Sequence, residues 1–398
     1  MLKYLYIFII TLFFISCVES PDADNPSQNN QVEQTPAAVI PVPDSTLYFD
    51  SVYAPYHKAI DTFFISKHNL RTFYGSVLFA ENGHVIFKNS YGYANLKTKD
   101  TLTTSSTFQL ASASKPFTAV SVMQLVEQGK IKLTDDIRSY LPLVPYDGIT
   151  IHQLLCHKSG MSQYTHFCDS PDTIWPDKHK TIHNNEVIDI MHKHVPMINY
   201  APGQKFYYCN TNYLLLASLV EKVSGLSFSD YLNLNIFKPL EMNNTVLYAR
   251  DNDSSLIHPA KGYNGAFNPT IDIYLNGVVG DKGVYSSVDD LIKFDRGLSA
   301  GKLVSDSTFQ LMIKSHNAVR KDGKNYGYGF RILENTEVGR LVFHTGWWKG
   351  FRTYFVRVPS LNQTVIVLTN VKRGGFMSVA ELAAIFPKVK TIIDGKSK

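Results

Sequence analysis

A chain of 398 residues, 44% of them hydrophobic and 13% aromatic, is long enough to bury a substantial core. Charged residues make up 18% of the sequence, the formal net charge is +5, and there is no run of five like charges. Because nucleic-acid binding depends on clustered positive charge, this composition argues against it.

The first residues predict export. Lys3 precedes an apolar run that ends at Ile15, which is shorter than the ~20 residues of a membrane-spanning helix. Ser16 and Cys17 follow, a small residue and then a cysteine. This pattern resembles a bacterial lipoprotein signal, which implies removal of residues 1–16, lipidation of Cys17 and anchoring to a membrane of the periplasm or cell envelope. An ordinary signal peptide with an incidental cysteine is the alternative.

Residues 17–48 predict a disordered linker. The stretch from Glu19 to Pro43 is rich in Pro, Asn, Gln, Asp and Ala and has almost no large apolar residue. Such a segment cannot bury enough surface to offset the entropy of ordering it. We expect it to hold a folded domain, residues 49–398, away from the membrane.

The domain begins with a helix and two strands. Apolar residues from Tyr53 to Phe64 recur at helical spacing. Two strands are expected at Tyr74–Ala80 and His84–Phe87, and Asn82-Gly83 between them favours a tight hairpin turn. A helix is then expected from the Ser112 segment to Gln128, with Gly129 as its C-cap.

Helical patterns dominate from about residue 130 to 270, and strands return in the last third. The expected elements are helices at Val187–His194 and Tyr213–Val223, strands at Tyr326–Leu333, Arg340–His344, Thr353–Val358 and Thr364–Leu368, a turn at Pro359–Gln363, and a closing helix at Ser378–Ile393. We therefore predict an α+β fold, an antiparallel sheet flanked by terminal helices. The sheet part comprises residues 49–125 and 270–398, and a helical subdomain, residues 126–269, is inserted between.

The first candidate for chemistry is Ser112-Ala113-Ser114-Lys115. Residues three apart share a helix face, so the Lys115 amine can lie beside the Ser112 hydroxyl and activate it as a nucleophile. Burial and the positive helix N-terminus both favour a neutral amine. A plain N-cap with a solvated lysine is the alternative. The spacing is weak evidence by itself, because Ser299 and Lys302 repeat it in a glycine-containing loop.

The second candidate is Tyr208-Cys209-Asn210, which lies between a Pro-Gly turn and an apolar helix. A tyrosine near Lys115 can move a proton between Ser112 and a leaving group. Asn210 can bind both a substrate amide and the lysine. A core tyrosine at a helix start is the alternative. Three other copies of this spacing begin at Tyr93, Tyr231 and Tyr274.

The third candidate is His344-Thr345-Gly346, at the edge of a predicted strand. A glycine there lets a substrate backbone lie alongside the strand, and Thr345 can donate to a substrate carboxylate. The amide of Trp347, with that of Ser112, is expected to form an oxyanion hole. The alternative is an exposed histidine at a strand end.

In this order, the three motifs resemble the serine β-lactamase and penicillin-binding protein family, and most closely its class C β-lactamase and D,D-peptidase branch. Two further stretches agree, Leu154–Met161 and Gly280–Ser287. The resemblance runs from about residue 50 to 370. It implies that Ser112 is acylated, that Lys115 and Tyr208 move protons, and that water releases the acyl group. It implies no metal or cofactor.

Two positions depart from the family pattern. His344 stands where β-lactamases of this branch carry lysine, and a neutral imidazole holds a β-lactam carboxylate less firmly. Cys209 stands where serine or alanine is usual. We therefore predict a hydrolase acting on a D-amino-acid peptide, such as a cell-wall stem peptide, or on a related amide or ester. A β-lactamase and a non-catalytic peptidoglycan-binding lipoprotein are the alternatives.

Histidines and cysteines suggest other functions only weakly. His179, His183, His192 and His194 match no helical metal motif, so we expect no metal site. Cys156, Cys168 and Cys209 are an odd number in an exported protein, which leaves at least one thiol free or in an intermolecular bond. Whether Cys156 and Cys168 form a bridge stays open, as do the substrate, the membrane face and the oligomeric state.

Overall fold

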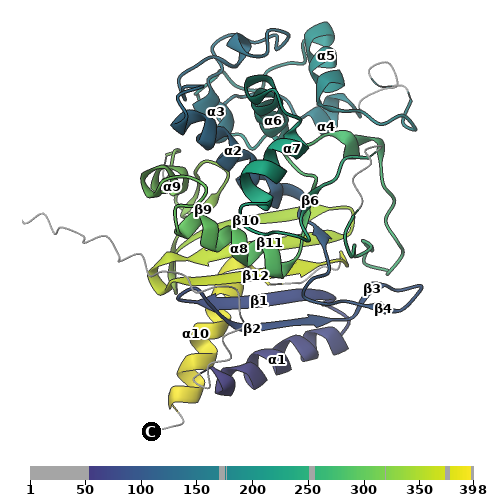
Figure 1. Cartoon of the computed structure of the whole chain (residues 1–398), viewed down its shortest axis with the longest axis vertical. Helices are drawn as coiled ribbons and strands as arrows, with labels where there is room; N and C mark the ends of the chain where they lie inside the picture. Colours follow the sequence, from purple (N-terminus) through teal and green to yellow (C-terminus); the bar gives the residue numbers. More distant parts are fainter. Residues whose placement is uncertain are drawn as a thin grey trace, which may run out of the picture. The chain divides into compact units, whose positions relative to one another are not determined.

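A seven-stranded antiparallel sheet forms the centre of the fold (Figure 1). The computed structural model describes residues 53–169, 175, 177–250, 256–318, 320–372 and 377–395. The signal segment, Cys17 and the linker at 17–48 lie outside these residues. The strand order is β2-β1-β12-β11-β10-β9-β8. The strands are β1 Gly75–Glu81, β2 His84–Tyr91, β8 Lys324–Tyr326, β9 Arg331–Thr336, β10 Gly339–Trp348, β11 Phe351–Val358 and β12 Gln363–Thr369.

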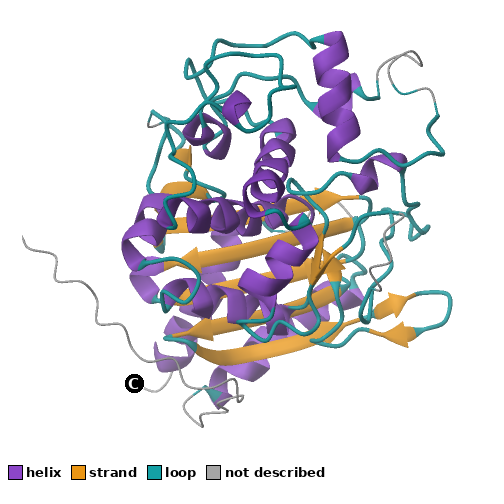
Figure 2. Ribbon diagram, turned by 45° about the horizontal axis from the view of Figure 1, so that its top comes forward, coloured by secondary structure: helices purple, strands orange, loops and turns teal. Residues whose placement is uncertain are grey.

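The two faces of the sheet are covered by different helices (Figure 2). On one face α1 (Ala54–Asn69) and α10 (Val379–Gly395) pack on inward-facing residues such as Val365 and Val367. On the other face α8 (Val288–Ser299) packs on β1 and β12, where Ile366 and Leu368 point. Successive residues of a strand point to opposite faces, and β12 is buried on both, with an apolar run from Val365 to Leu368.

The inserted segment is mainly helical and lies above the sheet in Figure 1. Its helices are α3 Ile151–Leu155, α4 Tyr164–Phe167, α5 Asn184–His194, α6 Asn210–Ser224 and α7 Phe228–Leu232. Helix α2 (Lys115–Glu127) contacts α6, and α9 (Asp306–Ile313) contacts α8. Every residue of α2 from Lys115 to Met123 is buried, including the polar Thr118 and Ser121, so the helix is enclosed on all sides in its first half.

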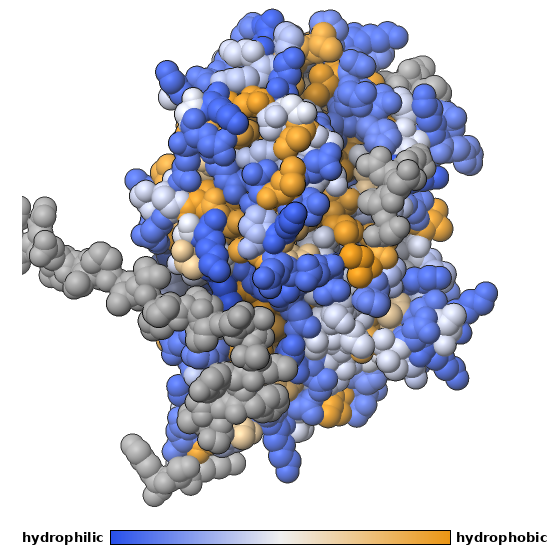
Figure 3. All heavy atoms as spheres, viewed as in Figure 1, coloured by the Kyte–Doolittle hydropathy of each residue, from blue (hydrophilic) through white to orange (hydrophobic). Residues whose placement is uncertain are grey.

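Short strands complete the described structure. Strands β3 (Tyr93–Asn95) and β4 (Asp100–Thr101) pair with each other. Strand β7 (Val284–Ser286) pairs with both β5 (Phe108–Gln109) and β6 (Val246–Leu247). The β5–β7 pair brings the segment before Ser112 next to the Gly280–Ser287 stretch. On the face viewed in Figure 3, hydrophobic residues lie in separate patches among hydrophilic ones.

The fold class predicted from sequence is confirmed, and so are the helices at both ends of the domain. The β1–β2 connection is the expected two-residue turn, with φ of 52° at Asn82 and 78° at Gly83. The single strand predicted over Tyr326–Leu333 was wrong. It is a hairpin of β8 and β9, because the backbone turns back at Gly327 and at Gly329, whose φ is 79°.

No helix among the described residues is long and apolar enough to cross a membrane.

Candidate active site

The backbone is strained immediately before Ser112. Ser112 lies in a 3₁₀ turn, Ala111–Ser114, that leads directly into α2. Ala111 has a φ of 51°, a conformation that non-glycine residues rarely adopt and that is concentrated at functional sites. Strand β10 crosses this turn at Gly346, where an added Cβ would lie 1.9 Å from the Leu110 carbonyl oxygen. Only glycine therefore lets β10 approach the nucleophile segment this closely.

Lys115 lies beside Ser112, fully buried at the first position of α2. Its Nζ is 3.3 Å from Ser112 Oγ. It also donates to Asn210 Oδ1 and to the Asp281 carbonyl oxygen, each at 2.9 Å. The partners of this amine are thus a hydroxyl, an amide oxygen and a backbone carbonyl, all of them neutral. No carboxylate among the described residues forms an ion pair with it. The predicted pairing of serine and lysine is present as hydrogen-bonding geometry.

Tyr208 lies across Lys115 from the nucleophile turn. The Lys115 Nζ is 5.1 Å from the centre of the Tyr208 ring, and the Arg331 guanidinium is 4.7 Å from it. The phenol oxygen is shielded from solvent. Burial raises the pKa of Tyr208, but the positive charges of Lys115 and Arg331, together with contacts of the phenol with the Lys115 amine and the Ser112 hydroxyl, outweigh burial and lower the pKa from its usual 10.0. The phenol is therefore suited to exchange a proton at this position.

Asn210 is held at the start of α6 by the loop before α4. Its backbone N–H donates to Gln163 Oε1 at 2.8 Å, and Gln163 Nε2 donates to the Tyr208 carbonyl at 2.6 Å. The backbone N–H of Cys209 donates to Nδ1 of the buried His157 at 3.2 Å. These contacts fix the whole Tyr208–Asn210 segment from the side of the inserted helical part.

His344 faces the protein interior. Its side chain is fully buried, Nδ1 donates to the Thr345 carbonyl at 2.8 Å, and the Tyr326 hydroxyl donates to Nε2 at 3.1 Å. Burial and the charges of Arg331 and Lys115 hold its pKa well below the usual 6.5. The imidazole is thus neutral and satisfied, and in this arrangement it supports the strand. The direct substrate contact predicted for it, and the alternative of an exposed strand-end histidine, do not fit this geometry.

The edge of β10 is open where the predicted substrate-binding residues lie. Strand β9 pairs with β10 only as far as Phe343, which is opposite Arg331. From His344 to Trp348, β10 pairs with β11 alone in the described structure. An extended chain can therefore lie along Thr345 and Gly346, with Arg331 at one end. The oxyanion-hole role of the Ser112 and Trp347 amides stays a prediction.

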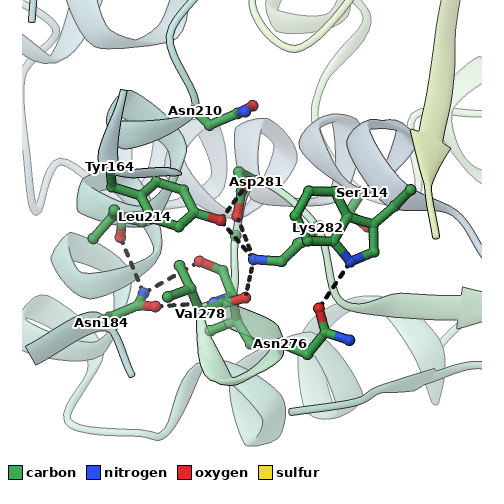
Figure 4. Close-up of polar contacts among 12 residues, drawn as sticks. Ser114, Tyr164, Asn184, Asn210, Leu214, Asn276, Val278, Asp281 and Lys282 are labelled. Atoms are coloured by element: carbon green, nitrogen blue, oxygen red, sulfur yellow. Dashed lines mark hydrogen bonds and ion pairs between the residues drawn. The ribbon is translucent and has the colours of Figure 1, made fainter. Parts of the chain in front are cut away.

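A second buried lysine, Lys282, lies in a network of polar contacts next to the site (Figure 4). Lys282 Nζ donates to Tyr164 Oη at 2.6 Å and to the Val278 carbonyl at 3.0 Å, and lies 3.6 Å from the Asp281 carboxylate. Tyr164 Oη in turn donates to that carboxylate at 3.0 Å. Because the Asp281 carbonyl accepts from Lys115, this network holds one of the two carbonyl or amide oxygens that accept from the Lys115 amine.

The remaining candidates lie apart from the site or are inert. Ser299 ends α8 and Lys302 lies in the exposed loop after it, so the second Ser-x-x-Lys spacing has no site around it. Burial raises the pKa of Cys156 and Cys168 to about 12 and of Cys209 to about 11, and all three are free thiols. Among the described residues, no group of three or more His, Cys, Asp or Glu is arranged to hold a metal ion.

Several contributors were not identified from sequence. Gln163 and Arg331 belong to no motif. Asp281 and Lys282 lie in a stretch that supported the resemblance, but their spacing indicates no role. Composition could have indicated their role. A charged pair inside an otherwise apolar and glycine-rich stretch needs hydrogen-bond or ion-pair partners when it is buried.

Residues 70–387 of the chain match the β-lactamase family. Penicillin-binding protein 4* of Bacillus subtilis (strain 168) is 33% identical over 326 residues, which cover 79% of this chain and 71% of the relative. An octameric penicillin-binding protein homologue from Pyrococcus abyssi has a similar structure, with a TM-score of 0.71, 26% identity and coverage of 85% of this chain and 77% of that one. The D-amino acid amidase of Ochrobactrum anthropi SV3 shares the fold, with a TM-score of 0.67, 22% identity and coverage of 86% and 98%.

Proposed function

The chain belongs to the β-lactamase family and is a serine hydrolase, and from this premise we propose that it cleaves a D-amino-acid peptide next to a free terminal carboxylate, in the manner of a D,D-carboxypeptidase. We infer the substrate class from the surroundings of Arg331. Its guanidinium stacks on Tyr208 at the end of the open edge of β10, and no carboxylate among the described residues pairs with it.

The chemical steps follow from the contacts around Ser112. Lys115 Nζ, when neutral, accepts the Ser112 proton as Oγ attacks the carbonyl carbon of the substrate. The C–N bond breaks, the leaving amine takes a proton through Tyr208, and the acyl group stays on Ser112 as an ester. Water then attacks that ester and gives the proton back to the serine. Asn210 holds Lys115 through this cycle.

Arg331 gives the substrate its direction. Its Nε is buried without a hydrogen-bond partner in the described residues, which is costly unless a ligand supplies one. A substrate carboxylate is the group that a guanidinium binds best, in bidentate geometry. With the carboxylate at Arg331, the chain runs back along Thr345 and Gly346, so the terminal residue becomes the leaving group.

A β-lactamase is the second candidate. The position before Thr345 carries a neutral, buried imidazole, so it adds no positive charge to hold a β-lactam carboxylate. This observation favours the peptidase over the β-lactamase. A related ester is compatible with the same residues, because only the leaving group differs.

The test is to incubate the protein from residue 45 onward with a penicillin and with N-acyl-D-alanyl-D-alanine, and to follow intact mass and product release. Ser112→Ala is the test variant and Ser299→Ala the matched control from the other Ser-x-x-Lys copy. A lasting penicillin adduct on the wild type and on Ser299→Ala, with release of D-alanine, supports the proposal. Rapid penicillin turnover with no peptide cleavage means a β-lactamase. Cleavage of esters alone means an esterase.

The anchor is a separate proposal. The sequence around Cys17 supports export and lipidation. Labelling of expressing bacteria with a fatty-acid analogue tests it: the wild type should carry label and fractionate with membranes, whereas Cys17→Ser should carry none. Wild-type protein that carries no label and stays in the soluble fraction would contradict the proposed lipid anchor.

A further inference from the structure

A cavity of about 420 Å³ is lined by Arg331 and by two neighbours of the candidate active-site residues, Phe206 and Tyr326. Five basic side chains line it: Lys158, Lys205, Arg320, Lys324 and Arg331. No acidic residue lines it. We call it the basic pocket.

The basic pocket shares a wall with the catalytic residues. Phe206 lines the pocket two residues before Tyr208, and Tyr326 lines it while its hydroxyl donates to His344. Arg331 lines the pocket and stacks on Tyr208. Because Arg331 ends the open edge of β10, the pocket continues from the leaving-group end of the substrate groove.

Two backbone hydrogen bonds connect the segments that carry Lys158 and Lys205, on one side of the pocket. Gly203 N–H donates to the Lys158 carbonyl at 2.8 Å, and Tyr207 N–H donates to the His157 carbonyl at 2.8 Å. These bonds fix Lys158 next to the loop that carries Lys205. On the opposite side, Asn325 Nδ2 donates to the Asn317 carbonyl at 2.9 Å and so ties β8 to the preceding loop.

The positive charge of the pocket is largely uncompensated. Arg320 and Lys324 share a single carboxylate, Asp322, at 3.1 Å each. Lys158, Lys205 and Arg331 have no carboxylate partner among the described residues. Five cations and one carboxylate leave a net charge of +4 around a cavity that also has apolar walls, including Phe206 and Phe343.

One terminal carboxylate needs only Arg331, so the other four basic side chains, with the Asp322 carboxylate that two of them share, leave a net charge of +3 beyond what the proposed function requires. We propose that the basic pocket binds a second anionic group, a carboxylate or a phosphate, carried by the leaving group of the substrate. This inference rests on the proposed function for the direction of the substrate. The preferred leaving group is then an amino acid or amino-acid derivative with an acidic side chain.

The experiment compares leaving groups that differ in charge. N-acetyl-D-alanyl-D-glutamate and N-acetyl-D-alanyl-D-glutamine differ by one charge, and O-phospho-D-serine against D-serine at the same position distinguishes a phosphate from a carboxylate. We expect kcat/KM to be about tenfold or more higher for the charged member of a pair, since a hydrogen bond between charged groups contributes at least this much. High salt should reduce the preference.

The variants test whether the pocket causes the preference. In Lys158→Gln/Lys205→Gln the ratio of the charged to the neutral substrate should fall toward one, whereas Lys302→Gln, an exposed lysine after α8, should leave it unchanged. The affinities of the same peptides for Ser112→Ala protein, measured by calorimetry, give the ratio without turnover.

Each result decides one proposal separately. Hydrolysis with no preference for either anionic leaving group overturns the basic pocket and leaves the proposed function standing. Preferential binding of a charged peptide to Ser112→Ala protein, without hydrolysis by the wild type, supports the pocket and overturns the proposed function. Failure of Ser112→Ala protein to bind any anionic peptide overturns the pocket.

Discussion

Two buried lysines, Lys115 and Lys282, contact the same residue, Asp281. Lys115 donates to the backbone carbonyl of Asp281, and Lys282 pairs with its carboxylate. The amine of Lys115 otherwise meets a serine hydroxyl and an amide oxygen, both neutral. The amine of Lys282 meets Tyr164 and the Val278 carbonyl besides the carboxylate.

The comparison shows how surroundings decide what a buried lysine does. The Asp281 carboxylate within 4 Å favours the charged form of Lys282 and pairs with it, although burial lowers the pKa of Lys282 overall. The neutral acceptors around Lys115 instead orient its amine next to the Ser112 hydroxyl. Lys282 and the Asp281 carboxylate hold the Asp281 backbone, and its carbonyl orients Lys115, the lysine that we propose activates Ser112.

Replacing the first lysine should have the largest effect. Lys115→Met removes the base that activates Ser112, and we expect kcat/KM to fall by roughly 10³–10⁴ with the fold retained. Lys302→Met, from the other Ser-x-x-Lys copy, should keep full activity. Steady-state kinetics with circular dichroism as the folding control makes the measurement. Activity within tenfold of the wild type would assign the base to another group.

Replacing the second lysine should act mainly on stability. Lys282→Met leaves the Asp281 carboxylate buried and unpaired, and we expect a loss of ~3–5 kcal/mol in the free energy of unfolding. Adding Asp281→Asn should recover part of it. Lys88→Met, which breaks the more exposed pair with Asp289, should cost no more than ~1 kcal/mol. Denaturant unfolding measures all three, and equal losses for Lys282→Met and Lys88→Met would refute the comparison.

Tyr208→Phe removes one proton carrier while keeping the ring between the two cations. We expect kcat/KM to fall by about 10²-fold, at the lower end of general acid–base effects, with kcat more affected than KM. Tyr93→Phe, from another Tyr-x-Asn copy, is the control. A Tyr208→Phe enzyme with wild-type kcat would show that the leaving group is protonated by another route.

The pH dependence of stability should reflect His157 and His344. Burial is the main cause that holds the pKa of each well below 6.5. Below pH 6.5 the unfolded chain binds protons that the folded chain does not, so stability is lost as pH falls. The loss is at most ~1.4 kcal/mol per pH unit for each histidine, with none between pH 8 and 7. His344→Gln should flatten this slope in denaturant titrations, and the exposed His192→Gln should not. An unchanged slope in His344→Gln would contradict the assignment.

Much of the fold was predictable because its signals are local. Apolar periodicity located the terminal helices, α2 and α6, and Asn82-Gly83 located the β1–β2 turn. The β8–β9 hairpin was missed because the apolar pattern of Tyr326–Leu333 continues through the turn, and only the glycines mark it. Three motifs in sequence order were enough to place the nucleophile, its lysine and the tyrosine in one site.

The sequence by itself determined the family, the fold class and the pairing of Ser112 with Lys115, because these depend on residue types at fixed spacing. The order of the motifs also indicated the contact of Lys115 with Asn210, but the fold makes it between segments 95 residues apart. Only the tertiary structure decided that His344 turns inward, that Asp281 contacts two lysines and that Arg331 lies opposite Phe343, where the pairing of β9 with β10 ends. Those facts depend on which strand edge is left unpaired and on which groups burial forces to find partners. Both result from contacts between segments that are far apart in the chain.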